Sequence, residues 1–399
     1  MQKNFYKHNE PIFTKKVKSI SFASSASLTV NNTLTINDDY ELTSNISSSS
    51  TGTLKSTNKI SITSDFTAST LTIQCVTLDA QASLNCKTLE ATDVILDKNF
   101  TYLDSSIPKI TGTLKFTGAI DQIFMSAPNP ATNPCEINDI EIEKTGGNLI
   151  FHQTPLKITG NVTDAASSPY GKFAFTRNTE LSGSSFLIKN ANLFSIDPLV
   201  TQITGGRTKI INTNFSNEAT VALSPDIIVS GDFTDTGNIS GSGKITLNGS
   251  SDQTFTPSAG STYTDIIINK ANTNSVTFDS SVKLSAAKIT VTQNGTTTFN
   301  GAVTITTFSD AADAGTINFN AGGTITNGLS FQTIGTVGVS GAQELSFTTG
   351  DFTHTAGSTS LNGKLKAANI TLGDISLKGA STLTGAVLFS GGADDSTRK

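Results

Sequence analysis

The sequence predicts an all-β protein in which short strands stack as a parallel β-helix, or β-solenoid. Three observations carry this prediction: short runs of alternating apolar and polar residues, an internal duplication of these runs, and a composition rich in hydroxyl side chains and glycine. The alternation is clearest in the runs 245–247, 265–270 and 276–278. Turn-forming or small residues separate the runs, at 248–249, 259–260 and 272–274. Period-two alternation between such clusters is typical of short strands joined by turns.

The same frame of strands and turns occurs in two related units, near residues 109–160 and 243–287. The motif Asp-Gln-x-Phe occurs at 121–124 and again at 252–255, DIEIEK at 139–144 matches DIIINK at 265–270, and NLIFHQTPLKI at 148–158 matches SVTFDSSVKLS at 275–285. Corresponding segments lie 126 to 131 residues apart, which indicates an internal duplication. Phe124 with Phe255, and Phe151 with Phe278, are therefore expected to face inward at equivalent positions of the coil.

The composition favours a folded β protein. Of 399 residues, 36% are hydrophobic and 15% charged, and the formal net charge is −5. Low apolar content can indicate disorder, but disorder also goes with high net charge and few β-branched residues, whereas Val, Ile and Thr are abundant here. The mild acidity offers no basic patch for nucleic acid or an anionic membrane. We therefore expect no nucleic-acid partner.

The three cysteines, Cys75, Cys86 and Cys135, exclude a complete disulfide framework because their number is odd. Two interpretations stay open for Cys75 and Cys86. They pair between neighbouring coils, or they are small thiols in a packed core or turn. The second interpretation is favoured.

Residues 1–18 are polar and basic, and we interpret them as a leader or cap that lacks the apolar core of a signal peptide. Residues 19–399 are expected to form one continuous solenoid. The C-terminal residues 391–399 end without a strand or cap, which favours truncation at the C-terminus. No stretch approaches the roughly 20 apolar residues of a membrane-spanning helix, so no membrane insertion by this segment is expected.

In chain order, residues 20–113 read as strands of three to five residues, because apolar positions alternate and nothing has helical spacing. The Pro-rich piece 126–138 is predicted to be a projecting loop, since proline cannot sit in a ladder-bonded central strand. After the second unit the sequence consists of a series of Thr-, Gly- and Asn-rich runs. Thr-x-Thr pairs recur there at irregular gaps, so a hydroxyl ladder in register for ice binding is not expected.

Five Asn-Gly pairs support an alternative, because Asn-Gly is also the preferred turn of a β-hairpin. The alternative is an array of β-sandwich domains, which usually need longer strands and more large apolar residues. The units continue without a natural end, which favours the solenoid.

The frame Asp-Gln-x-Phe, loop, Asp-Ile-x-Ile-x-Lys, x-Val-x-Phe resembles repeats in large bacterial surface proteins. The residues that carry the resemblance are Asp121-Gln122, Phe124, Asp139–Lys144 and Phe151 in the first unit, and Asp252-Gln253, Phe255, Tyr263, Asp265–Lys270 and Phe278 in the second. The proteins it resembles are autotransporter passengers and filamentous-haemagglutinin-like adhesins of the outer membrane. The resemblance implies a right-handed parallel β-helix that is secreted and exposed at the cell surface.

A search for chemistry gives no catalytic, cofactor-binding or metal-binding residue. His8, His152 and His354 lie far apart, without ligand-like spacing. No nucleophile elbow, phosphate loop or dinucleotide motif is present, and residues 391–396 lack the tandem spacing of a calcium nonapeptide repeat. Acidic pairs occur at 38–39 and 394–395, and Asp310 is near Asp313. Adjacent strand residues point to opposite faces, so these pairs are not placed for acid–base work.

The function expected from the sequence is structural and adhesive: a rod that contacts glycans or proteins of a host or a neighbouring cell, outside the bacterium. The alternative is a β-helical carbohydrate-active enzyme, a hydrolase or lyase, whose carboxylates would come from neighbouring coils. Five Tyr and no Trp leave little surface for stacking on sugars, which favours the adhesive function. We accordingly expect no enzymatic activity.

Overall fold

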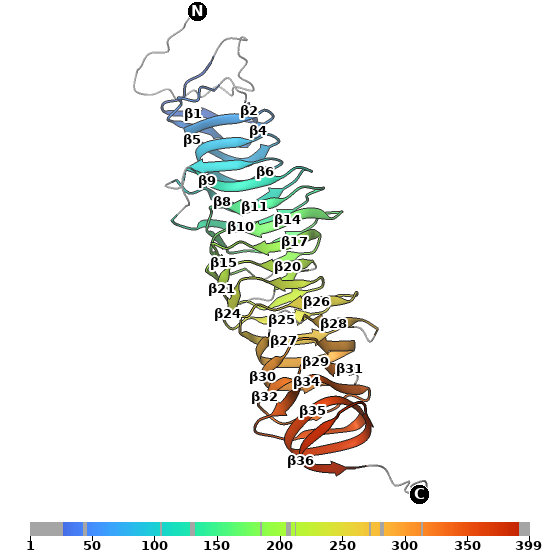
Figure 1. The fold of residues 1–399 in the computed structure, drawn as a ribbon. Coiled ribbons are helices and arrows are strands. Elements are labelled where there is room, and N and C mark those ends of the chain that lie inside the picture. Colours follow the sequence, from blue (N-terminus) through green and yellow to red (C-terminus); the bar gives the residue numbers. More distant parts are fainter. Residues whose placement is uncertain are drawn as a thin grey trace, which may run out of the picture.

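The computed structural model describes residues 27–390, apart from gaps at 43–45, 104–105, 128–131, 184–185, 205–208, 212, 271–272, 280–282 and 313. The described residues form 36 strands and no helix. The strands follow one another down an elongated column, with the start of the described chain at one end and its last strand at the other (Figure 1). They pair in parallel and make a β-solenoid of about 16 turns. At about 4.8 Å per turn, the rod is about 75 Å long.

The first third of the chain contains β1 Thr33–Ile36, β2 Tyr40–Leu42, β3 Thr53–Ser56, β4 Lys59–Ile62, β5 Phe66–Ala80, β6 Leu84–Leu96, β7 Phe100–Leu103, β8 Lys109–Phe116, β9 Gln122–Ala127, β10 Cys135–Ile142 and β11 Leu149–His152. The middle contains β12 Leu156–Ile158, β13 Val162–Asp164, β14 Tyr170–Phe175, β15 Thr179–Leu181, β16 Phe186–Ile188, β17 Ala191–Ile196, β18 Gln202–Thr204, β19 Lys209–Ile211, β20 Asn214–Asn217, β21 Thr220–Leu223, β22 Ile227–Val229, β23 Phe233–Asp235, β24 Asn238–Ser240, β25 Lys244–Leu247, β26 Gln253–Thr256, β27 Tyr263–Asn269 and β28 Ser275–Phe278. The last third contains β29 Leu284–Phe299, β30 Val303–Asp310, β31 Ala314–Phe319, β32 Gly323–Ile325, β33 Leu329–Phe331, β34 Thr336–Phe347, β35 Phe352–Leu377 and β36 Thr382–Phe389.

The parallel pairing confirms the solenoid and contradicts the hairpins of the sandwich alternative. The Asn-Gly pair at 248–249 lies at a corner instead of a hairpin turn. A Cβ on Gly249 would meet the carbonyl oxygen of Ser230, one coil earlier, at 1.8 Å. Glycine is required there because two coils approach closely at the corner.

The coils differ in length, and several strands are longer than expected. Contacts between neighbouring coils join residues from 16 to 28 positions apart. Strand β5 has 15 residues, against the three to five predicted for residues 20–113, and β29 and β35 have 16 and 26 residues, because the backbone keeps its pairing through some corners. The coil, not the strand, is therefore the repeating unit.

A stack of aromatic rings fills the middle of the coil. The first column of paired residues is Phe100, Phe124, Phe151, Phe175 and Ile196. The second is Leu149, Phe173, Phe194, Phe215, Phe233, Phe255, Phe278, Phe299 and Phe319. The four phenylalanines expected to face inward are buried, which confirms that part of the prediction. The predicted equivalence of the two units is wrong by two residues. The phenylalanines of the first unit lie in the first column, and those of the second unit lie in the second column.

The Pro-rich piece is less of a loop than expected. Ser126 lies in β9 and Cys135 in β10, and both side chains are buried, so the predicted loop is wrong at both of these positions; residues 128–131 lie outside the described part. Cys75, Cys86 and Cys135 are buried free thiols, as the favoured interpretation predicted. The expected leader 1–18 and the segment after residue 390 also lie outside the described residues.

Candidate functional site

Most of the polar chemistry inside this rod joins one coil to the next. Asp and Asn side chains at or beside the corners accept a hydrogen bond from a backbone N–H of the following coil, at 2.7 to 3.0 Å. We call these contacts coil brackets; they include Asp65, Asp93, Asn99, Asp121, Asp139, Asn148, Asn178, Asn214, Asp226, Asp232, Asp252 and Asp351. A backbone N–H donor holds the pKa of Asp65 and that of Asp252 below their usual range.

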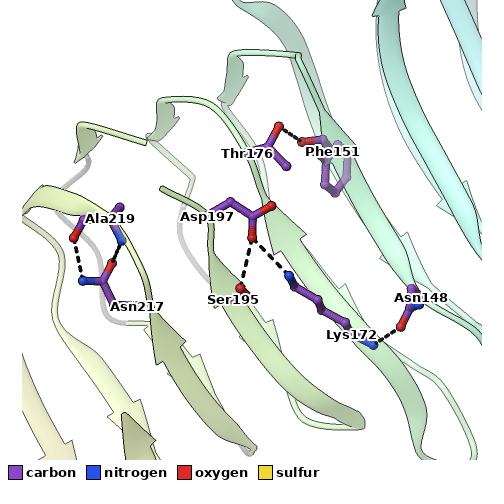
Figure 2. Close-up of polar contacts among 8 residues, drawn as sticks. All are labelled: Asn148, Phe151, Lys172, Thr176, Ser195, Asp197, Asn217 and Ala219. Carbon is purple, nitrogen blue, oxygen red and sulfur yellow. Dashed lines mark hydrogen bonds and ion pairs between the residues drawn. The ribbon is translucent and has the colours of Figure 1, made fainter. Parts of the chain in front are cut away.

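Figure 2 shows how such contacts run through the middle of the rod. The amide oxygen of Asn148 accepts the backbone N–H of Lys172 at 2.7 Å, one coil further on. The ammonium of Lys172 in turn donates to the Asp197 carboxylate at 3.1 Å, which also accepts the Ser195 hydroxyl at 3.1 Å. The ion pair is about one third exposed and contributes about 0–1 kcal/mol, so this chain of contacts is mainly structural.

The duplicated motif forms a more unusual arrangement, which we call the first lock in the first unit. Lys144, just after β10, is fully buried; its Nζ donates to the side-chain oxygen of Gln122 at 2.9 Å and to the carbonyl of Ile120 at 2.8 Å. Gln122, at the start of β9, donates through Nε2 to the carbonyl of Leu96 at 2.8 Å and to that of Lys98 at 3.4 Å. Three successive coils are tied by one lysine–glutamine pair.

The second unit repeats the arrangement as the second lock. The buried Lys270 donates to the side-chain oxygen of Gln253 at 2.8 Å and to the carbonyl of Ser251. Gln253 Nε2 donates to the carbonyls of Val229, at 3.1 Å, and Gly231, one coil earlier. The two locks share their residue types and the pattern of donors and acceptors, although Gln122 and Gln253 are offset by two residues in the register of the coils.

Each lock lysine is held in a site that disfavours its charge. Burial lowers the pKa of Lys144 to about 8, although the carboxylates of Asp121 and Asp97 act in the opposite direction. Burial also lowers the pKa of Lys270 to about 8, against the effect of Asp252 and Asp232. A buried ammonium is costly unless its protons are accepted, which explains why the Asp-Gln pair and the distant Lys recur together.

An open groove of about 450 Å³ lies against the second lock. Its lining residues are Lys189, Ser230, Asn248, Gly249, Ser250 and Ser251. Gly249 N–H donates to the side-chain oxygen of Gln253 at 3.1 Å, so one lining residue of the groove contacts the lock directly. The lining offers hydroxyl, amide and ammonium groups, and neither a carboxylate nor an aromatic ring is among its six residues.

The histidines lie apart, as the sequence indicated. His354 is buried, with Nδ1 3.0 Å from the Thr359 hydroxyl and Nε2 3.1 Å from the carbonyl oxygen of Thr333. Burial lowers the pKa of His354, so the imidazole is a neutral core group. His152 is half-buried in β11, and His8 lies outside the described residues.

The acidic pairs considered in the sequence do not form a common site among the residues that the structure covers. Asp39 accepts the side-chain amide of Asn58 at 2.6 Å, and Asp310 accepts the backbone N–H groups of Gln332, at 2.9 Å, and Thr333, at 2.8 Å. Asp313, Asp394 and Asp395 are outside the described part. The described members of these pairs therefore have structural partners.

Asp310 gives a prediction for pH dependence. Burial raises its pKa to about 6 from 3.8, so between these values the folded state binds more protons than the unfolded state, and Asp310 lowers stability as the pH rises. Asp310→Asn should therefore become more stable relative to the parent between pH 3.8 and 6, by about 1–2 kcal/mol once partial exposure is allowed for.

Urea unfolding of both proteins across this range measures the difference. Asp252→Asn is the control with the opposite sign, because the pKa of Asp252 is lowered in the folded state; its stabilising contribution develops as the pH rises toward 3.8, so the measurements extend below pH 3.8. An Asp310→Asn difference that is flat between pH 4 and 6 would contradict the prediction.

Within the described ranges, no group of three or more His, Cys, Asp or Glu side chains is arranged to hold a metal ion. The same residues contain no helix that is long and apolar enough to cross a membrane.

The sequence found the lock residues through their duplication but did not assign them a role. The hydrogen bond between Gln122 and Lys144 could not be predicted, because these residues are 22 positions apart and the coils vary in length. No protein-family model, curated protein or solved structure matches this chain.

Proposed function

We propose that this chain is a structural and adhesive segment of a bacterial cell-surface or secreted protein. In this proposal the solenoid is a rod outside the cell, and its outer faces contact glycans or proteins of a host or a neighbouring cell. The resemblance of its duplicated units to repeats of autotransporter passengers and filamentous-haemagglutinin-like adhesins supports this assignment.

One structural observation carries the proposal. On the outward side of the aromatic stack, hydroxyl and amide side chains line up from coil to coil; we call this the hydroxyl face. One column is Thr254, Thr277, Thr298, Asn318 and Ser360, interrupted by Gly338. The neighbouring column contains Ser275, Thr296, Thr316, Thr336 and Ser358.

The hydroxyl face suits weak contacts repeated along a rod. Each hydroxyl donates and accepts hydrogen bonds, and the pattern recurs at the strand spacing of about 4.8 Å. A single site of this kind binds weakly, whereas many sites that engage together raise the overall affinity through effective concentration. The groove beside the second lock adds an amide and an ammonium to the same class of polar contacts.

The test is stepwise removal of whole coils. Phe278 and Phe299 occupy the same position in successive coils, so deleting residues 279–299 removes one coil and keeps the register; deleting 279–319 removes two. We expect binding to immobilised bacterial or host-cell surfaces to fall progressively with each coil. Complete loss on the first deletion, in a variant that still folds, would contradict a distributed contact surface.

The same protein should be incubated with a panel of polysaccharides and assayed for new reducing ends or unsaturated products. We expect none. Product formation that disappears when one Asp or Glu is changed to Ala would overturn the proposal and assign the chain to the hydrolases or lyases.

A further inference from the structure

We propose that each lock is a site of covalent self-modification, in which the lysine Nζ condenses with the glutamine side-chain amide to form an isopeptide bond. The bonds would join Gln122 to Lys144 and Gln253 to Lys270. Each would link two successive coils through their side chains. The inference does not depend on the proposed adhesive function.

The first argument is proximity. Nζ lies 2.9 Å from the amide oxygen in the first lock and 2.8 Å in the second. A carbonyl bond is about 1.2 Å long, so the amide carbon lies no farther than about 4.1 Å from the amine. Reacting atoms held at about 3–3.5 Å are in a near-attack arrangement, so a shift of less than about 1 Å reaches it.

The second argument is the state of the amine. An ammonium has no lone pair, so only the neutral amine attacks a carbonyl. Burial lowers the pKa of both lock lysines to about 8, so a substantial fraction of each is neutral in mildly alkaline solution. The four lock side chains are 0 to 3% exposed, which keeps competing water away from the amide carbon.

The third argument is the orientation of the amide. Gln122 Nε2 is fixed by the carbonyls of Leu96 and Lys98, so its oxygen faces the amine. In the second lock, Gly249 N–H also donates to the Gln253 oxygen at 3.1 Å. That donor is placed to stabilise the negative charge that develops on the oxygen during attack.

The reaction balances without a further reactant. The Nζ lone pair forms a bond to Cδ, the Cδ–Nε2 bond breaks, and Nε2 leaves as ammonia with the proton that Nζ gives up. One hydrogen stays on the new amide nitrogen. Neither oxidation nor reduction occurs, and the product is a secondary amide in the same buried space.

The experiment is intact-mass measurement of the folded full chain after denaturation, followed by proteolysis and peptide mapping. We expect the mass to be lower than the sequence mass by two ammonia molecules, and two branched peptides that join 122 to 144 and 253 to 270. Lys144→Met should lose the first branched peptide only. Lys157→Met, which removes a surface lysine paired with Glu136, should keep both.

Peptide mapping is the deciding measurement because the Asn-Gly pairs can also lose ammonia, as cyclic imides in linear peptides. Ammonia loss confined to linear peptides would overturn the proposal. So would the full sequence mass in protein held for days at pH 9. The parent protein gives both readouts, so the proposal stays testable even when a lock variant fails to fold.

Discussion

Gln253→Leu should destabilise the coils around the second lock by about 3–5 kcal/mol, because it leaves a buried ammonium without its main acceptor. In the parent, Lys270 donates to the Gln253 side chain and to one backbone carbonyl, and Gln253 donates to two carbonyls of the preceding coil. The substitution removes all the contacts of Gln253 together. Hydrogen exchange of the β22, β25 and β27 amides, together with urea unfolding, measures the loss.

The matched control is the double variant Gln253→Leu/Lys270→Met. It removes the charge with its partner, and replacing both members of a buried polar pair by apolar groups of similar size is often nearly neutral. We expect the double variant to recover most of the stability that Gln253→Leu loses relative to parent protein in which Gln253 and Lys270 are not covalently joined. A double variant that is less stable than the single one would show that the lysine does not need the glutamine.

Phe278→Ala should cost about 3–5 kcal/mol, as expected for a large-to-small change in a packed core. Phe278 is 1% exposed and lies between two aromatic neighbours, with ring centroids 5.0 Å from Phe255 and 4.6 Å from Phe299. Because each coil of a solenoid contacts only its neighbours, the loss should stay within the adjacent coils. Hydrogen exchange along the rod, coil by coil, measures both the size and the spread of the effect.

Phe389→Ala is the control, since this ring is 53% exposed in the last described strand. Its effect should be within about 0.5 kcal/mol, the usual range for a surface change. Loosening that extends evenly from one end of the rod to the other would contradict a nearest-neighbour architecture. A negligible effect of Phe278→Ala would contradict its place in the aromatic column.

The sequence was sufficient for the fold class because the solenoid depends on a pattern that repeats locally. Alternation of apolar and polar residues marks the inward positions, and duplication marks the units. The length of each coil could not be predicted, because the number of residues at a corner can vary while the alternation of inward-facing residues in the strands stays the same. The two-residue offset between Phe124 and Phe255, and the register of Thr298 with Thr277, follow from those corners.

The contacts within the two locks could not be predicted from the sequence for the same reason. The sequence contained Gln122 and Lys144 in a repeated motif, but their contact depends on the length of the corner between them. The coil brackets were missed for a related reason, since an Asp before a strand reads as a turn residue whether or not its carboxylate has a partner in the next coil. The duplication was the only sequence signal for the locks. It identified the lock residues but did not show which of them contact each other.

The coil brackets all have the same direction along the chain. In each bracket the side-chain acceptor comes earlier in the chain than its backbone donor: Asp139 accepts from Asn161, and Asp252 accepts from Ser275. An N-terminal portion therefore already presents the Asp and Asn acceptors that bind the backbone of the next coil, whereas a C-terminal portion made first would present only the donors of these brackets. A chain that emerges from a ribosome or a secretion pore N-terminus first can add one coil at a time on a finished template.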